Sequence, residues 1–393
     1  MAALASCWTC VQAWQTWRLD ARSLVQVNST SDLQTEEMAL RSALDGLGAC
    51  DFSKGIWSNY LASPRQGELH FNGDARGQGL GNILGGLGRA VQLAIVTKRN
   101  LKVDFSIGGV PFLNIAPVRE GGPIQKTRST GGCSYSASAF NFGSSTPPEG
   151  LMAAAKDSGK FPVFCLSGNF GSSKWEDTLL ANLGVQKSSV DSKLGCALDF
   201  ALDPTESKKL VKPPPDTFQL VGHLRLGDVY MTGGGDMCDS GRRVLTSIFH
   251  SPENAGVGFA NCMQGVAQQL MVADGRKKCQ LVLLSDNQAA KHEASLHAKS
   301  GPCTLVVDEH SVARHSATHA FDESQALGTL GELLTIANAD AALLTGSGFG
   351  LAGASMGPIL SGKAFKIENL MEGQSNPTND MVGFCQQARL QSM

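Results

Sequence analysis

The stretch that decides the fold reads ELHFNGDARGQGLGNILGGLGRAVQLAIVTKRNLKVDF, residues 68–105. Residues 68–72 form a short strand-like run, and residues 101–105 form a second. A glycine-rich turn and a strongly apolar helix separate the two runs. Because parallel strands require a crossover connection, which a helix supplies, the stretch predicts a βαβ unit and an α/β protein with a parallel sheet.

Outward from this stretch, the same alternation predicts two Rossmann-like domains, since 393 residues exceed what one hydrophobic core holds. Three consecutive prolines at 213–215 cannot continue a helix or a central strand, so they mark the linker. The predicted parts are an N-terminal extension at 1–67, a first domain at 68–212 and a second at 216–393. The extension contains a predicted helix at 30–47, and residues 111–148 are expected to form a loop or insertion.

Strands and helices alternate along the rest of the chain. In the first domain we expect a strand at 161–167 and helices at 174–183 and 194–202. In the second we expect strands at 218–224, 280–285, 304–308 and 341–344, with helices at 254–273, 289–300 and 324–337.

Composition excludes several classes of function. The formal charge of -2 and the pI near 6.4 give no general attraction to nucleic acid or anionic lipid. No apolar run is long enough to span a membrane, and residues 1–13 lack the basic region of a signal peptide. The 11 cysteines are odd in number and scattered, so they predict neither a disulfide framework nor a metal site, and Cys7 with Cys10 is interpreted as an incidental pair.

The glycine-rich turn contains Gly79, Gly81 and Asn82 between a strand end and a helix start. Free backbone N–H groups and the helix dipole favour an anion there, although such turns also serve close packing. Neither a Gly-Lys-Ser/Thr motif nor a spaced acidic ribose partner follows, which disfavours a P-loop NTPase or a dinucleotide oxidoreductase.

A second candidate cluster follows the strand at 218–224 and comprises His223, Arg225 and Asp228. Arg225 suits phosphate because its planar guanidinium stays charged and can donate two parallel hydrogen bonds. The structural alternative is a satisfied core histidine beside a local Arg225–Asp228 ion pair.

Two more strand ends carry small polar residues that could hold a base, a ribose or a phosphate, or form ordinary loops. They are Ser285-Asp286-Asn287 and the stretch from Asp340 through Thr345 and Ser347 to Phe349. A rival cluster of Asp308, His310, His315 and His319 has two imidazoles four residues apart, which could chelate zinc. No HExxH motif accompanies it, so we interpret it as a polar loop and expect no metal.

Together these motifs resemble those of GDP-fucose-dependent transferases, the α1,2, α1,6 and protein O-fucosyltransferase groups. The matching residues are Gly79-Leu80-Gly81-Asn82, His223-Leu224-Arg225, Ser285-Asp286-Asn287, and Ala339-Asp340 with Thr345, Ser347 and Phe349. Their order and spacing fit the family over residues 73–356.

The resemblance implies a GT-B-like fold, two Rossmann-like domains facing a cleft, and a hexosyltransferase that uses GDP-fucose and a glycan or protein acceptor. It implies an inverting displacement without a metal or other cofactor, with Arg225 neutralising the β-phosphate. His223 and the Gly81-Asn82 turn would assist, and Asp286 would read guanine or ribose. The nucleotide-sugar site implied by the family comprises Gly79, Gly81, Asn82, His223, Arg225, Asp286, Asn287, Asp340, Thr345, Ser347 and Phe349.

The chain departs from the family at two points. Many members have a second arginine where this chain has Leu226, and residues 229–235, where some members place a glutamate base, contain no acid. Asp228 and Asp236 are the nearby carboxylates and our candidates for the base. The alternative functions are a noncatalytic nucleotide-sugar or glycan binding protein on this scaffold and another nucleotide-binding α/β enzyme. The compartment is open: the secretory pathway, in the Golgi lumen, if the protein is eukaryotic and its N-terminus is incomplete, and otherwise the cytoplasm.

Overall fold

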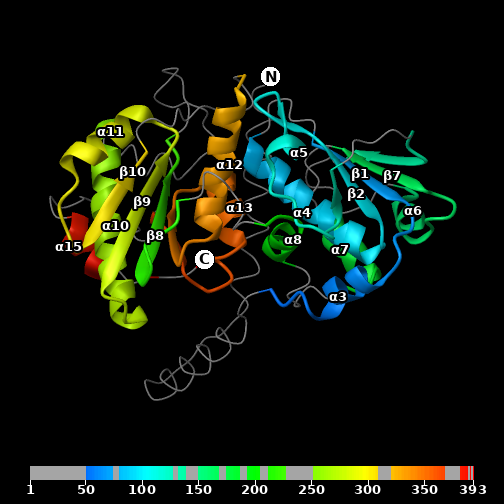
Figure 1. Ribbon diagram of the computed structural model, residues 1–393, viewed down its shortest axis with the longest axis horizontal. Helices are drawn as coiled ribbons and strands as arrows, with labels where there is room; N and C mark the ends of the chain where they lie inside the picture. Colours follow the sequence, from blue (N-terminus) through cyan, green and yellow to red (C-terminus); the bar gives the residue numbers. More distant parts are fainter. Residues whose placement is uncertain are drawn as a thin grey trace, which may run out of the picture. The chain divides into compact units, whose positions relative to one another are not determined.

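The computed structural model describes residues 50–73, 79–126, 132–138, 149–167, 174–185, 193–203, 211–226, 251–308, 320–367, 381–387, 390 and 393. They fall into two compact units, the first comprising Met1–Gln78, Asn82–Phe105 and Val118–Leu202, and the second Gly79–Gly81, Ser106–Pro117 and Asp203–Met393. Each unit is built around a parallel sheet (Figure 1). The predicted α/β class is confirmed, while the predicted domain limits and cleft stay predictions.

The first unit has a five-stranded sheet in the order β5-β2-β1-β7-β6, with every neighbouring pair parallel. Its strands are β1 (Glu68–Asn72), β2 (Asn100–Asp104), β5 (Ile124–Gln125), β6 (Tyr135–Ser138) and β7 (Val163–Ser167). Its helices are α3 (Gly55–Ala62), α4 (Leu80–Val96, in this unit from Asn82 onward), α6 (Leu151–Lys156), α7 (Lys174–Asn182) and α8 (Leu194–Ala201). β1, α4 and β2 form the predicted βαβ unit.

The central helix of that βαβ unit buries one continuous stripe. Leu84, Leu87, Val91 and Ala94 follow one another at helical spacing and are fully buried. The crossover therefore forms because α4 and the neighbouring strands bury their apolar faces together.

Part of the segment assigned to an N-terminal extension belongs to the core of the first unit. In α3, Trp57 and Tyr60 are buried, and the Trp57 ring lies 5.0 Å from the Phe200 ring. A disulfide also joins Cys50 to Cys196. The helix predicted at 30–47 lies outside the described residues.

The segment predicted as a loop at 111–148 carries regular structure. Its first residue, Pro111, ends β4 (Val110–Pro111), which pairs antiparallel with β3 (Ser106–Ile107). The segment then forms α5 (Phe112–Ile115) and both edge strands of the first sheet, β5 and β6. The loop prediction was wrong for these residues because such short elements have too few positions to show periodicity.

The second unit has strands β8 (Thr217–Leu224), β9 (Lys278–Ser285), β10 (Cys303–Val307), β11 (Ala341–Leu344) and β12 (Ala364–Lys366). They are parallel throughout and follow the order β10-β9-β8-β11-β12. Numbered along the chain, this is the 3-2-1-4-5 order of a doubly wound Rossmann-type sheet. The four strands predicted in this half are confirmed, and β12 was missed because it has only three residues.

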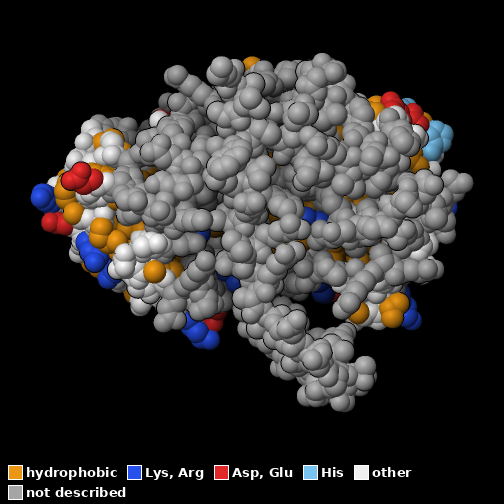
Figure 2. Space-filling view, turned by 180° about the vertical axis from the view of Figure 1, so that it is seen from behind, with side chains coloured by type: hydrophobic (Ala, Val, Ile, Leu, Met, Phe, Trp, Pro, Cys, Tyr) orange, Lys and Arg blue, Asp and Glu red, His pale blue; other side chains and the backbone are white. Residues whose placement is uncertain are grey.

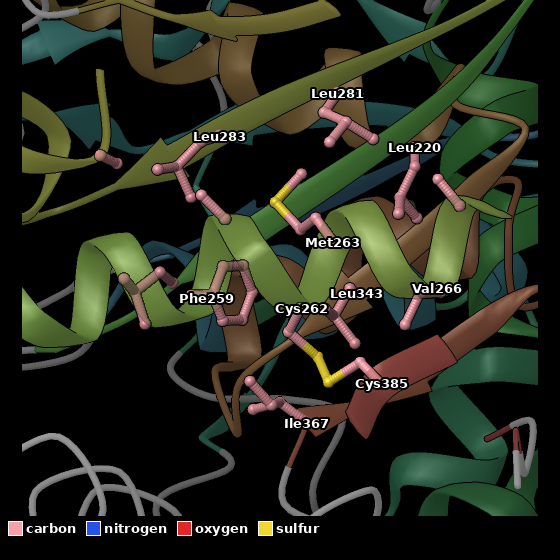
Figure 3. Close-up of a cluster of buried hydrophobic side chains, with 14 of the residues drawn as sticks. Leu220, Phe259, Cys262, Met263, Val266, Leu281, Leu283, Leu343, Ile367 and Cys385 are labelled. Atoms are coloured by element: carbon pink, nitrogen blue, oxygen red, sulfur yellow. A yellow bond between two sulfur atoms is a disulfide. The ribbon is translucent and has the colours of Figure 1, made fainter. Parts of the chain in front are cut away.

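Helices cover both faces of the second sheet. On one face lie α10 (Pro252–Asp274), α11 (Gln288–His297) and α15 (Met381–Gln387), and on the other lie α12 (Glu323–Ala337) and α13 (Gly348–Ser355). Figure 3 shows α10 with Phe259 and Met263 packed against strand residues such as Leu220, and the Cys262–Cys385 disulfide. The edges of the sheet, rather than its covered faces, are therefore where ligands could reach it.

Four disulfides join eight of the eleven cysteines, and the other three lie outside the described residues. The pairs are Cys50–Cys196, Cys133–Cys165, Cys262–Cys385 and Cys279–Cys303. Sequence spacing did not predict them, because separations from 24 to 146 residues are set by the tertiary fold.

The described surface mixes charges. Among the side chains drawn in colour in Figure 2, basic and acidic groups lie beside one another and beside apolar ones. No helix within the described ranges has the length and apolarity that crossing a membrane requires.

Candidate functional site

The candidate site lies at the carboxyl edge of the second sheet, between β8 and β11. These strands are neighbours, with Leu344 in register with His223. The chain continues from β8 to α10 on one face and from β11 to α13 on the other, so the strand order reverses at this pair. Open α/β sheets bind their ligands at such a reversal, because the two diverging loops leave room above the strand ends.

Thr345 joins the loops that follow the two strands. Its Oγ1 accepts a hydrogen bond from the Arg225 backbone N–H at 2.8 Å and donates one to the His223 carbonyl at 3.2 Å. The Thr345 N–H donates to the same carbonyl at 3.1 Å, and the residue is 2% exposed. The backbone at Arg225 is therefore fixed by a buried hydroxyl that comes 120 residues later in the chain.

Asp286, directly after β9, fixes the same segment from the other side. Its carboxylate forms an ion pair with the Arg225 guanidinium and accepts a hydrogen bond from the Leu226 N–H at 2.8 Å. The Arg225–Asp228 pair considered as an alternative stays untested, because Asp228 lies outside the described residues.

His223 is buried and uncharged near neutral pH. Burial lowers its pKa to about 4; Asp286 acts in the opposite direction, and Arg225 lowers it further. Its ring lies 5.4 Å from the Phe349 ring, and no described atom bonds to its buried Nδ1. A Cβ at Gly350 would lie 2.8 Å from that nitrogen, so the glycine leaves room for the imidazole. His223 is therefore not the satisfied core histidine of the structural alternative.

The first turn of α13 presents backbone donors beside this ring. Ser347 is the N-cap residue, yet its side chain makes no capping hydrogen bond. The first N–H groups of a helix have no partner inside it and favour an anion. A Cβ at Gly81, in the same unit, would lie 2.2 Å from the Gly348 carbonyl carbon and 2.3 Å from the Phe349 nitrogen. Gly81 therefore lies directly against the first turn of α13, at a position where only glycine fits.

One of the expected residues, Asn287, caps the helix that follows it. The Asn287 side chain accepts a hydrogen bond from the Ala290 N–H at 3.0 Å and caps α11. Asn82 is exposed in the first turn of α4 and belongs to the first unit, whereas Gly79 is half-buried in the second.

Asp340 does not join the group. It precedes β11, so it lies at the amino edge of the sheet, opposite the edge that carries Arg225. Its carboxylate pairs with Arg276, at 2.8 Å from Nη2, and accepts the Gln219 N–H at 2.8 Å. β11 separates it from Thr345, and its described contacts are those of a structural ion pair. Its expected role in nucleotide-sugar binding stays a prediction.

Several expected residues lie outside the described ranges, namely Asp228, Asp236, His310, His315 and His319. Of the histidine-rich cluster only Asp308 is described, and its carbonyl accepts a hydrogen bond from the Lys291 ammonium at 2.9 Å. Within the described residues no group of three His, Cys, Asp or Glu side chains could hold a metal ion.

Lys291 was not singled out from the sequence, although it is 1% exposed near the same edge. It lies four residues after Asn287 in a helix rich in polar residues. Its sequence context therefore resembles that of any surface lysine, and only tertiary burial distinguishes it.

A Rossmann-type unit with a fixed arginine beside a helix N-terminus is suited to a nucleotide or another phosphate ligand. No known family model matches the chain, and no curated protein matches it.

Several solved structures are similar to the chain. NodZ α-1,6-fucosyltransferase co-crystallised with GDP is 11% identical, covering 75% of this chain and 94% of that chain with a TM-score of 0.37. Fucosyltransferase NodZ from Bradyrhizobium is 12% identical, with 75% and 94% covered and a TM-score of 0.34. POFUT1 in complex with GDP-fucose is 13% identical, with 80% and 97% covered and a TM-score of 0.37. These solved structures are fucosyltransferases, like the family that the motifs resemble, but with TM-scores below 0.5 the matches carry no argument about this chain.

Proposed function

We propose that this chain is a fucosyltransferase that transfers fucose from GDP-fucose to a hydroxyl group of a glycan or protein acceptor. The observation that carries the proposal is the position of Arg225. Its backbone is held by Thr345 and its guanidinium by Asp286, at the reversal point of a Rossmann-type sheet. A guanidinium that keeps its charge and is fixed in direction is the group best suited to a diphosphate.

In the proposed reaction, the acceptor oxygen attacks the anomeric carbon of fucose as the bond to the β-phosphate oxygen breaks. Negative charge then grows on the departing GDP. Arg225 and the N–H groups of the first α13 turn would stabilise that charge without a metal, which is electrostatic stabilisation by groups already in place. Attack opposite the phosphate would invert the anomeric configuration.

His223 supports this assignment through its neutral state. With a pKa of about 4, it adds no positive charge near pH 7, and its neutral ring lies against Phe349. Phosphate binding therefore depends on Arg225 and on backbone donors. The base that takes the acceptor proton is proposed to be Asp228 or Asp236.

A second candidate function is noncatalytic binding of a nucleotide sugar. Leu226, which stands where many family members have a second arginine, is 2% exposed and packs in the hydrophobic core of the second unit. That position therefore supplies no cation. Binding would survive this difference, whereas stabilisation of the departing GDP would be weaker.

We further propose that the protein folds in an oxidising compartment, the secretory pathway with the Golgi lumen as its destination. Four disulfides support this proposal, because such bonds form and persist where thiols are not kept reduced.

The test is calorimetric titration of the purified chain with GDP, UDP, ADP and NAD in metal-free buffer, followed by assays with GDP-fucose. The informative variant is Arg225→Lys, which keeps a cation beside Asp286 but loses the planar fork. Arg276→Lys is the matched control, because Arg276 forms carboxylate pairs at the opposite edge of the same sheet. The proposal is supported if the chain binds GDP selectively and releases fucose from GDP-fucose, and if both fall in Arg225→Lys but not in Arg276→Lys. GDP binding without turnover favours the noncatalytic candidate.

A further inference from the structure

We propose that Asp286 is a positioning residue that acts through Arg225, rather than a residue that reads the guanine or ribose. The inference rests on the proposed function and deepens it, since it assigns how the diphosphate-binding cation is held. Asp286 directly contacts both parts of the segment in question: the side chain of Arg225 and the backbone of Leu226.

Both carboxylate oxygens of Asp286 take part in this arrangement. Oδ1 accepts the Leu226 N–H at 2.8 Å, and Oδ2 lies against Nη1 of Arg225. A carboxylate that holds consecutive residues by backbone and side chain fixes both the position and the direction of the guanidinium. The side chains of Arg225 and Asp286 are 18% and 14% exposed, so water screens the pair little.

The backbone that carries Asp286 is itself held on both sides. Ser285 is the last residue of β9 and is 2% exposed, and its Oγ accepts the Asn287 N–H at 3.2 Å. Asn287 in turn caps α11. The carboxylate therefore projects from a fixed link between strand and helix, as a positioning group requires.

Electrostatics predicts opposite changes in GDP affinity for a positioning role and for no role of Asp286. An aspartate close to a diphosphate repels it, so removing the negative charge without any positioning role would strengthen GDP binding. If Asp286 orients Arg225, the loss of orientation outweighs the gain in charge and binding weakens. If Asp286 instead reads the nucleoside, then GMP and GDP weaken by the same factor.

The test uses Asp286→Asn, which keeps the shape and an oxygen for the Leu226 N–H but loses the charge. Asp274→Asn is the matched control: Asp274 is also 14% exposed and paired with an arginine, Arg276, at the other edge of the sheet. Each protein is titrated by calorimetry with GDP, GMP and inorganic pyrophosphate, and the variant is repeated in an Arg225→Lys background.

We expect Asp286→Asn to weaken GDP and pyrophosphate roughly ten- to a hundredfold while GMP changes far less. We also expect little further loss in the Arg225→Lys background, and unchanged affinities in Asp274→Asn. Tighter GDP binding, equal losses for GDP and GMP, or additive losses in the double variant would overturn the inference.

The same titrations distinguish failure of the proposed function from failure of the positioning role. If the wild-type chain binds pyrophosphate through Arg225 and Asp286 but shows no preference for GDP, the fucosyltransferase proposal falls and the positioning role stands. If it binds neither GDP nor pyrophosphate, both are overturned.

Discussion

Replacing Thr345 by valine removes the hydroxyl that joins the β8 and β11 loops and keeps the branched shape. The variant leaves the Arg225 N–H without its 2.8 Å acceptor at a site that is 2% exposed. A buried donor without a partner costs about 1–3 kcal/mol. The His223 carbonyl loses one donor but keeps the Thr345 N–H at 3.1 Å, so it adds little. We therefore expect the second unit to lose about 2 kcal/mol of unfolding free energy.

The assay must report on the second unit alone. Trp57, the tryptophan with a described side chain, is buried in the first unit, so its fluorescence reports on that unit. Hydrogen exchange of the peptide covering residues 217–226 reports on the second unit, since it contains β8 and the Arg225 amide. In Thr345→Val this peptide should exchange faster, and GDP affinity should fall because Arg225 is displaced.

Thr345→Ser is the control, because serine keeps the hydroxyl and loses only a methyl group, at a cost of about 1 kcal/mol. It should retain GDP affinity and the protection of the Arg225 amide. Equal protection and affinity in the valine and serine variants would refute the role assigned to the hydroxyl.

Two further predictions concern stability. Because burial lowers the folded-state pKa of His223 from 6.5 to about 4, the unfolded state binds its proton first, so the second unit should lose up to about 3 kcal/mol as pH falls from about 6.5 to about 4. Hydrogen exchange at pH 7, 6 and 5 should show a flatter dependence in His223→Gln; parallel profiles would contradict this. Removing the Cys262–Cys385 bridge, with a separation of 123 residues, should cost about 2–4 kcal/mol, and removing Cys279–Cys303, with a separation of 24, about 1 kcal/mol less. Equal losses in calorimetry would show that loop closure does not set the difference.

The sequence predicted the parts of the fold that repeat a strong pattern. The strand at 341–344 coincides with β11, and the helix at 254–273 lies within α10. Long apolar runs bounded by turns have one compact solution, a parallel sheet covered by helices. The edge strands β5, β6 and β12 have two to four residues and carry no such pattern.

The site was predicted as a set of residues, but their partnerships were not. Arg225 and Asp286 follow different strands, and only the pairing of β8 with β9 brings them together. Asp340 precedes β11 and therefore lies at the amino edge of the parallel sheet, away from Arg225. A motif match alone does not distinguish the edge that binds ligands from the opposite one.

These contacts also constrain how the second unit can bind a diphosphate. The charges of Arg225 and Asp286 cancel to first order, and His223 is neutral near pH 7. A cation free in solution would attract phosphate over a distance, whereas this pair contributes mainly through hydrogen bonds at short range. Affinity must then depend on the direction of the guanidinium and of the α13 N–H groups, which salt screens far less than a net charge. If the proposed site binds by orientation, GDP affinity measured by calorimetry should depend only weakly on ionic strength, and a steep dependence would contradict this.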